Sequence, residues 1–162
     1  IVHPYMLHAV LFLIPVLATA QPVLEPGALG GMEGQWSGEL MYIDYSSGAE
    51  THIPATLTVE MLGRRSWRRT FAYPGEPGSD EVDTLVLSPD GNLPNDGAVS
   101  EVAMLGDGVM QLTLLQDGED DDVPVRIRKV WTIGSNSLML RKEVCPIAGG
   151  PFKLRHKYLF AR

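Results

Sequence analysis

The feature that most constrains the fold is a two-residue repeat of apolar side chains, which begins near Gln35 and continues to the end of the chain. In residues 53–61 the odd-numbered positions are apolar and most even-numbered positions are polar. Because successive side chains of a β-strand point to opposite faces, this pattern predicts a strand with one face in a core. The same alternation recurs in eight further stretches: 40–45, 66–73, 82–87, 99–105, 109–115, 123–133, 138–144 and 152–160.

Short segments of turn-forming composition separate these stretches. Examples are Ser46–Gly48, Pro89–Asn92 and Gly106–Gly108, in which glycine supplies positive φ angles and Asp or Asn side chains bond to the local backbone. Strands joined in succession by hairpin-length loops form a meander, and a meander of about eight to ten strands hides its edges most simply by closing. We therefore predict an all-β fold with a single up-and-down antiparallel β-barrel. A two-sheet sandwich is the alternative, but the longest connection, residues 90–97, is short for the crossover that a sandwich usually needs.

The first part of the chain has a different character. Residues 6–20 form an uncharged, mostly apolar run that ends in Ala18-Thr19-Ala20, which is typical of a secretory signal peptide. A membrane anchor is the alternative, but Pro15 interrupts the run, which is also shorter than the roughly 20 apolar residues that a spanning helix needs. We expect a secreted or periplasmic protein without a membrane span in its mature form. The expected parts are a signal peptide over residues 1–20, an irregular lead-in over residues 21–33 and the barrel over residues 34–162.

The charge of the chain limits its possible partners, and its cysteine content limits how the domain is stabilised. The chain has 13 Lys and Arg residues against 20 Asp and Glu residues, a formal net charge of -7. Such an acidic surface repels phosphate backbones, so we predict no nucleic-acid partner. The single cysteine, Cys145, allows no internal disulfide, and the domain must therefore gain its stability from its core.

Gly34-Gln35-Trp36, at the head of the first predicted strand, resembles the G-x-W motif of the lipocalin and wider calycin families. The resemblance implies that Trp36 packs across the closed end of the barrel. It also implies an arginine of the last strand against that Trp, and Arg155 and Arg162 are the positions that match. A guanidinium stacked on indole is a favourable contact. Because no helix is predicted before the last strand, the nearer likenesses are helix-poor calycin barrels such as the avidin and nitrobindin groups and bacterial secreted lipocalin-like domains. An ordinary core aromatic is the alternative interpretation of Trp36.

The interior of such a barrel favours a small, mainly hydrophobic ligand. The aromatic candidates for its binding site are Tyr42, Phe71 and Tyr158. Arg69 shares a strand face with Phe71, so it is the candidate for binding an anionic head group. The alternative for Arg69 is a solvated outer face that balances the acidic surface.

His156 shares a strand face with Tyr158 and is the last candidate for the binding site. A nitrobindin-like haem barrel needs an inward histidine as axial ligand. We predict no cofactor, with haem on His156 as the alternative to a hydrogen-bonded core histidine. Too few His and Cys residues remain for a catalytic zinc site, so we predict no metal.

Motifs of catalytic chemistry are missing from the sequence. It contains no G-x-S-x-G, no P-loop and no cysteine with a convincing histidine partner, so we predict no catalytic residue. A binding protein is therefore favoured over two alternatives. One is a calycin-type enzyme that acts on a hydrophobic substrate in the same pocket, and the other is an envelope or scaffold protein with a filled barrel.

Overall fold

A computed structural model describes residues 22–44 and 46–162 of the chain. The expected signal peptide, residues 1–20, lies outside the described residues. Within the described part, no helix is both long enough and apolar enough to span a bilayer.

Nine strands and one short helix make up the structure, and all nine stretches predicted from the two-residue repeat form strands. The segment expected to be an irregular lead-in contains the helix, a 3-10 helix with Pro26 in its first turn. The helix was not predicted because seven residues are too few to show a helical repeat of apolar side chains in the sequence. In chain order the elements are η1(Pro26–Met32), β1(Gly34–Ile43), β2(Glu50–Gly63), β3(Ser66–Ala72), β4(Glu81–Val86), β5(Ala98–Gly106), β6(Val109–Asp120), β7(Val123–Ile133), β8(Ser137–Pro146) and β9(Lys153–Ala161).

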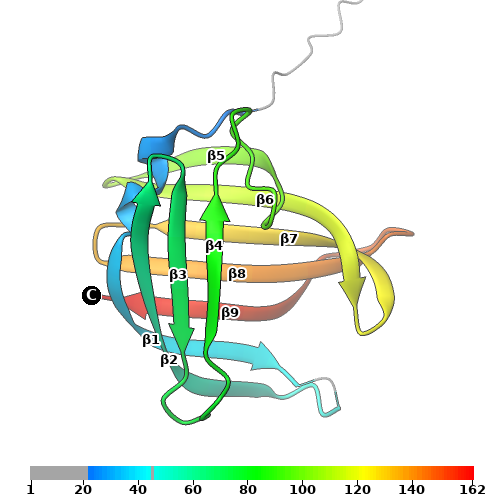
Figure 1. Cartoon of the computed structure of the whole chain (residues 1–162). Coiled ribbons are helices and arrows are strands. Elements are labelled where there is room, and N and C mark those ends of the chain that lie inside the picture. The colour runs from blue at the N-terminus through cyan, green and yellow to red at the C-terminus, as the bar shows by residue number, and fades with distance from the viewer. Residues whose placement is uncertain (1–21, 45) are drawn as a thin grey trace, which may run out of the picture.

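The nine strands form one antiparallel sheet in the order β4-β3-β2-β1-β9-β8-β7-β6-β5. Consecutive strands are neighbours, as expected for an up-and-down meander, and β1 pairs with β9. The remaining consecutive strands, β4 and β5, lie at the two ends of this order. The sheet therefore curls into a half-barrel in which β2, β3 and β4 lie across from β6, β7 and β8 (Figure 1).

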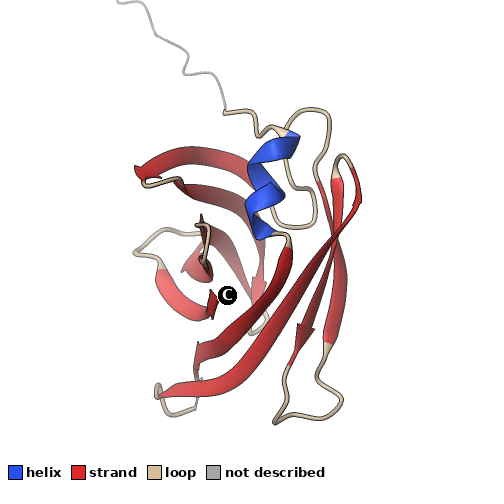
Figure 2. Ribbon diagram, turned by 90° about the vertical axis from the view of Figure 1, so that its left-hand side faces the viewer, coloured by secondary structure: helices blue, strands red, loops and turns tan. Residues whose placement is uncertain are grey.

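One end of the half-barrel is closed by η1, which lies between the two walls of the sheet (Figure 2). Leu29 and Met32 of the helix are almost fully buried, as is Leu24 just before it. The connection between β4 and β5 closes the same core, because Leu87 and Leu93 belong to one hydrophobic cluster with these residues. This end of the barrel is filled by apolar side chains.

Strand register explains why the core lies at that end. Ile133, Leu138 and Phe160 are cross-strand neighbours on β7, β8 and β9, and all three are buried. The same row continues through Gly38 of β1 to Ala55 of β2. Small residues on one side and large ones on the other let the two walls come together here.

We expect Gly38→Ala to lower the free energy of unfolding by at least about 2 kcal/mol, as in other overpacked cores. A Cβ on Gly38 would lie 1.9 Å from the carbonyl oxygen of Leu159, so β1 and β9 would have to separate. Urea unfolding of the variant measures the loss. Gly30→Ala is the matched control, since a Cβ on Gly30 meets no atom within 4 Å and should change stability by less than about 0.5 kcal/mol. An equally stable Gly38→Ala variant would contradict the close contact of β1 with β9.

Candidate functional site

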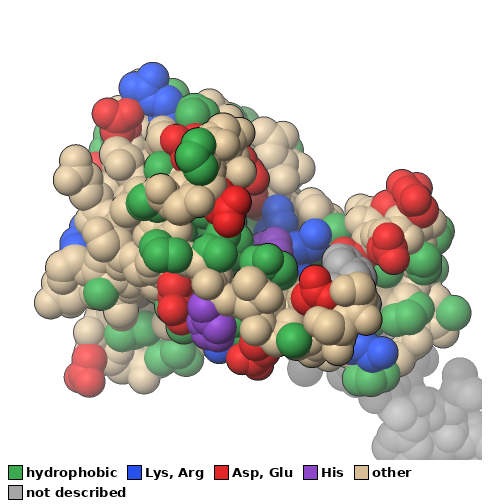
Figure 3. Space-filling view, turned by 90° about the horizontal axis from the view of Figure 1, so that it is seen from below, with side chains coloured by type: hydrophobic (Ala, Val, Ile, Leu, Met, Phe, Trp, Pro, Cys, Tyr) green, Lys and Arg blue, Asp and Glu red, His purple; other side chains and the backbone are tan. Residues whose placement is uncertain are grey.

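The half-barrel contains an open pocket of about 740 Å³, a size typical of sites for small organic molecules. The end of the molecule opposite η1 is hollowed, and Lys or Arg and His side chains lie in the hollow (Figure 3). All five residues predicted for the binding site line this interior pocket: Tyr42, Arg69, Phe71, His156 and Tyr158.

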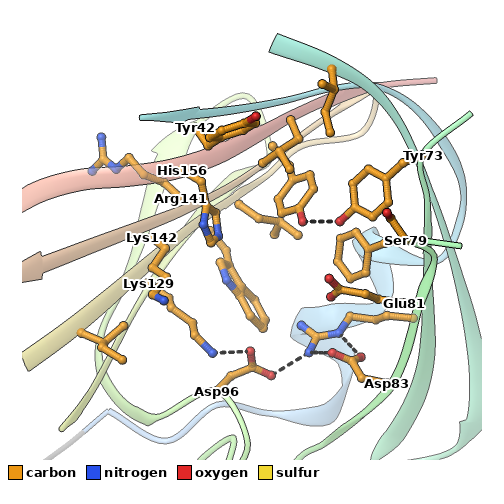
Figure 4. A pocket seen from close by; sticks show the side chains of 18 of the residues that line it. Tyr42, Tyr73, Ser79, Glu81, Asp83, Asp96, Lys129, Arg141, Lys142 and His156 are labelled. Atoms are coloured by element: carbon orange, nitrogen blue, oxygen red, sulfur yellow. Dashed lines mark hydrogen bonds and ion pairs between the residues drawn. The ribbon is translucent and has the colours of Figure 1, made fainter. Parts of the chain in front are cut away.

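A row of basic side chains crosses the strands at the open end of the interior pocket. Lys129 of β7 is paired with Lys142 of β8, and Lys142 is paired with His156 of β9. All three line the pocket and project into it from one side (Figure 4). We call these three residues the basic row. Tyr42, opposite His156 on β1, ends the row with a phenol group.

The next row toward η1 is apolar and lines the floor of the interior pocket. Trp131, Leu140 and Tyr158 are cross-strand neighbours on β7, β8 and β9. Leu40 of β1 and Ile53 of β2 continue the row, and all five residues line the pocket. The pocket thus changes from charged at its mouth to apolar toward the closed core.

The environment of His156 favours a neutral imidazole. Burial, together with the positive charges of Lys142, Lys129 and Arg155, lowers its pKa from 6.5 to about 4, and Asp120 opposes this shift only weakly. A neutral imidazole retains one ring nitrogen that accepts a hydrogen bond or binds iron.

Arg69 points inward and is buried, so it does not belong to a solvated outer face. Its Nε and Nη2 atoms each donate to a carboxylate oxygen of Asp83 at 2.7 Å. Nη2 also donates to Asp96 at 3.0 Å, and the guanidinium carbon lies 5.5 Å from the ring centre of Trp131. These contacts already neutralise Arg69, so an anionic ligand group would have to compete with two carboxylates for it.

Asp96 connects the two walls of the sheet. It lies in the connection between β4 and β5, and one of its oxygens accepts from Arg69 of β3. The other accepts from Lys129 of β7, with the ammonium nitrogen at 2.8 Å. The carboxylate is almost fully buried, which strengthens both ionic contacts. Asp96 therefore connects β3 and β7, which are not neighbours in the hydrogen-bonded sheet.

Two tyrosines from the two walls meet in the pocket: Tyr158 of β9, next to the basic row, and Tyr73, directly after β3. The hydroxyl oxygens of Tyr73 and Tyr158 are 2.6 Å apart, and the ring centres of Tyr158 and Phe71 are 5.0 Å apart. Burial, and then the bond to Tyr73, raises the pKa of Tyr158. Both phenols are therefore uncharged at neutral pH and act as hydrogen-bonding groups in an aromatic cluster.

The residues predicted to close the barrel lie at two different places. The guanidinium carbon of Arg162 is 4.2 Å from the ring centre of Trp36, and its Nη1 and Nε donate to backbone oxygens of Glu33 and Ser135. Gly34 has a φ of +115°, and a Cβ there would crowd Arg162 at 3.2 Å. The structure thus places Arg162, and not Arg155, over Trp36.

Arg155 lies toward the open end, where its Nε is 2.9 Å from Asp120. It lines a second hollow that shares Tyr42, Lys142 and His156 with the interior pocket. In the pairing of β1 with β9, His156 is opposite Tyr42 and Ala161 is opposite Ser37, so Arg155 lies at the end of β9 that is farthest from Trp36.

Sequence reasoning missed Lys142, Tyr73 and Asp96 as residues of the site. A signal for Lys142 was present, because it follows Leu138 and Leu140 at two-residue spacing and so shares their inward face. No periodic signal exists for Asp96, since it lies in a connection whose path only the folded structure gives.

The described residues also bear on metal and haem binding. Among them, no group of three or more His, Cys, Asp or Glu side chains is placed to hold a metal ion. Of the two histidines among the described residues, His156 has the properties of a haem ligand, namely an inward position in the interior pocket and a neutral ring. His156 would hold the haem iron through its free ring nitrogen, and Lys142 would offer positive charge to the haem carboxylates.

Comparison with known proteins supports the fold. No family model matches the chain, and no curated protein matches it. Among solved structures, it is similar to the one described as "Crystal Structure of Rv2717c from M. tuberculosis", with a TM-score of 0.59 and 16% sequence identity. The similarity covers 87% of this chain and 99% of the other. At this identity it shows a shared β-barrel-like fold, and the resemblance to the calycins remains a prediction.

We expect Asp96→Asn to lower the free energy of unfolding by about 3 kcal/mol, because it leaves Arg69 and Lys129 without the carboxylate that pairs both. Thermal or urea unfolding at neutral pH measures the change. Asp117→Asn is the matched control: its ion pair with Arg126 is exposed, so the loss should be below about 1 kcal/mol. Equal losses in the two variants would contradict the role of Asp96 in joining the walls.

The lowered pKa of His156 predicts a pH dependence of stability. Between the unfolded value of 6.5 and the folded value of about 4, the unfolded chain binds more protons than the folded one, so stability falls as the pH falls. The stability is fully present above pH 6.5, and this histidine should remove at most about 3 kcal/mol of it by pH 4. NMR titration of the ring protons gives the midpoint, and His156→Gln should show a weaker loss of stability over this range. A midpoint near 6.5 would contradict the burial of the ring beside Lys142.

Proposed function

We propose that the protein binds a small amphipathic molecule in the interior pocket, with an anionic group of the ligand at the basic row. The observation that carries the proposal is the pairing of Lys129, Lys142 and His156 on three adjacent strands, all facing the same hollow. Given the signal peptide expected at residues 1–20, we further propose that binding takes place outside the cytoplasm.

The charges of the basic row are unevenly balanced in the unliganded protein. Like charges directly opposite each other on adjacent strands repel, and Lys129 and Lys142 are such a pair. Lys129 is neutralised by Asp96 at 2.8 Å, whereas the described residues place no carboxylate within ion-pair distance of Lys142. A carboxylate or phosphate of a ligand would supply the missing counter-charge at Lys142, and neutral His156 would donate or accept a hydrogen bond beside it.

The apolar floor of the pocket determines the chemistry of the rest of the ligand. Trp131, Leu140 and Tyr158 present apolar surface directly next to the basic row. A ligand with its anionic group at Lys142 would therefore lie with a hydrocarbon or aromatic body on these residues, where burial contributes about 25 cal/mol per Å² of apolar surface. An open pocket with this gradient of polarity favours an amphipathic ligand over a fully apolar one.

Haem is the second candidate ligand, because the neutral ring of His156 lines the interior pocket. Bound haem iron would supply redox or gas-binding chemistry. The residues of this chain would contribute the axial nitrogen of His156 and positive charge from Lys142 for the haem carboxylates.

We expect the purified protein to bind dodecanoate and Lys142→Gln to bind it about tenfold more weakly, since a charge-assisted contact contributes about 1.5 kcal/mol or more. Isothermal titration calorimetry measures both affinities. Lys153→Gln is the control, because Lys153 is exposed at the start of β9 and does not line the pocket.

Absence of dodecanoate binding, or equal loss in both variants, would contradict the proposal. A visible Soret band that appears on addition of haem and disappears in His156→Ala would favour the second candidate instead.

A further inference from the structure

The interior pocket also has a side of opposite charge. Glu81 of β4 lines it and is the cross-strand neighbour of Phe71. Figure 4 shows the Glu81 carboxylate directed into the pocket, toward the side from which His156, Lys142 and Lys129 project. Positive and negative side chains thus face each other across one hollow.

The charges between these two sides cancel locally. Arg69 and Lys129 carry two positive charges, and their partners Asp83 and Asp96 carry two negative ones. Over the described residues, the ion pairs that form leave Lys142 on the basic side without a partner of opposite charge, and they leave two lining carboxylates, Glu76 and Glu81, unpaired as well. Of the two carboxylates, Glu81 is the one that lies on a strand beside the aromatic ring of Phe71 and faces the side of Lys142 (Figure 4).

Glu81 stands beside aromatic rings that favour a cation. Phe71 is directly opposite it, and Tyr158 lies 5.0 Å from Phe71 between ring centres. The hydroxyl of Tyr73 meets that of Tyr158 at 2.6 Å, and the charge of Glu81 acts on both phenols. An ammonium group is recognised by this combination of a carboxylate and aromatic faces.

We propose that the ligand is a zwitterion whose ammonium group binds between Glu81 and the rings of Phe71, Tyr73 and Tyr158, while its anionic group binds at Lys142. This inference rests on the proposed function, because it names the ligand class for the same pocket. Trp131 and Leu140 line the pocket next to the basic row, so a small apolar body joins the two charged groups of the ligand. Amino-terminated fatty acids and short apolar peptides have this chemistry.

Dodecanoate and 12-aminododecanoate form the decisive pair of probes. They share a chain length and a carboxylate, and the added ammonium makes one end less hydrophobic. Without an acidic site, 12-aminododecanoate must therefore bind more weakly than dodecanoate. We expect it to bind at least about tenfold more tightly, because an ammonium paired with Glu81 forms a charge-assisted contact.

Glu81→Gln should remove this preference and leave the affinity for dodecanoate unchanged. Glu101→Gln is the matched control, because Glu101 is also an exposed glutamate on the strand at the other end of the sheet and lies outside the pocket. Calorimetry with both probes on the three proteins gives the affinities, and thermal unfolding shows that each variant is folded.

The outcomes separate the two proposals. If dodecanoate binds through Lys142 but 12-aminododecanoate binds no better, the zwitterion inference is overturned and the proposed function stands. The inference also fails if the preference persists in Glu81→Gln. If neither probe binds, the proposed function itself is overturned.

Discussion

The ionic contacts of Asp96 with Arg69 and Lys129 hold the two walls of this half-barrel in place. A meander whose first and last strands pair can close completely only if β4 and β5 also pair, and here they lie at the two ends of the sheet. The connection between them buries Leu87 and Leu93 in the core and directs Asp96 inward. Charge pairing thus links the two walls through this connection, where β4 and β5 form no backbone ladder.

This arrangement divides the interior into a closed end and an open one. At the closed end, η1, Trp36 and Arg162 exclude water from a filled core. On β7, β8 and β9 the side chains two residues farther along line an open pocket, and two residues beyond those lie Lys129, Lys142 and the neutral His156. The alternative of a filled barrel, which the sequence left open, therefore applies only to the end near η1. The other end has a hollow that can hold a ligand.

The sequence predicted the parts of this structure that depend on local alternation. All nine strands follow from the two-residue repeat. The inward positions of Tyr42, Phe71 and Tyr158 follow from it too, because each lies at two-residue spacing from the apolar residues of its strand. The seam between β4 and β5 was not predicted, since strand pairing depends on curvature that no local pattern encodes. The partners of Arg69 could not be predicted either: Asp83 lies on a neighbouring strand and Asp96 in an irregular connection, and only register brings them to it.

The central claim is that a ligand binds inside the half-barrel with its anionic group at the basic row. Mapping of NMR chemical shifts during titration with dodecanoate tests it most directly, because the method locates binding residue by residue. We expect the largest changes at Lys142, His156 and Leu140, with their inward neighbours on β7 and β9. Changes confined to the exposed apolar residues Met61, Leu62, Met104 and Leu105 would place binding on the outer surface and contradict the account.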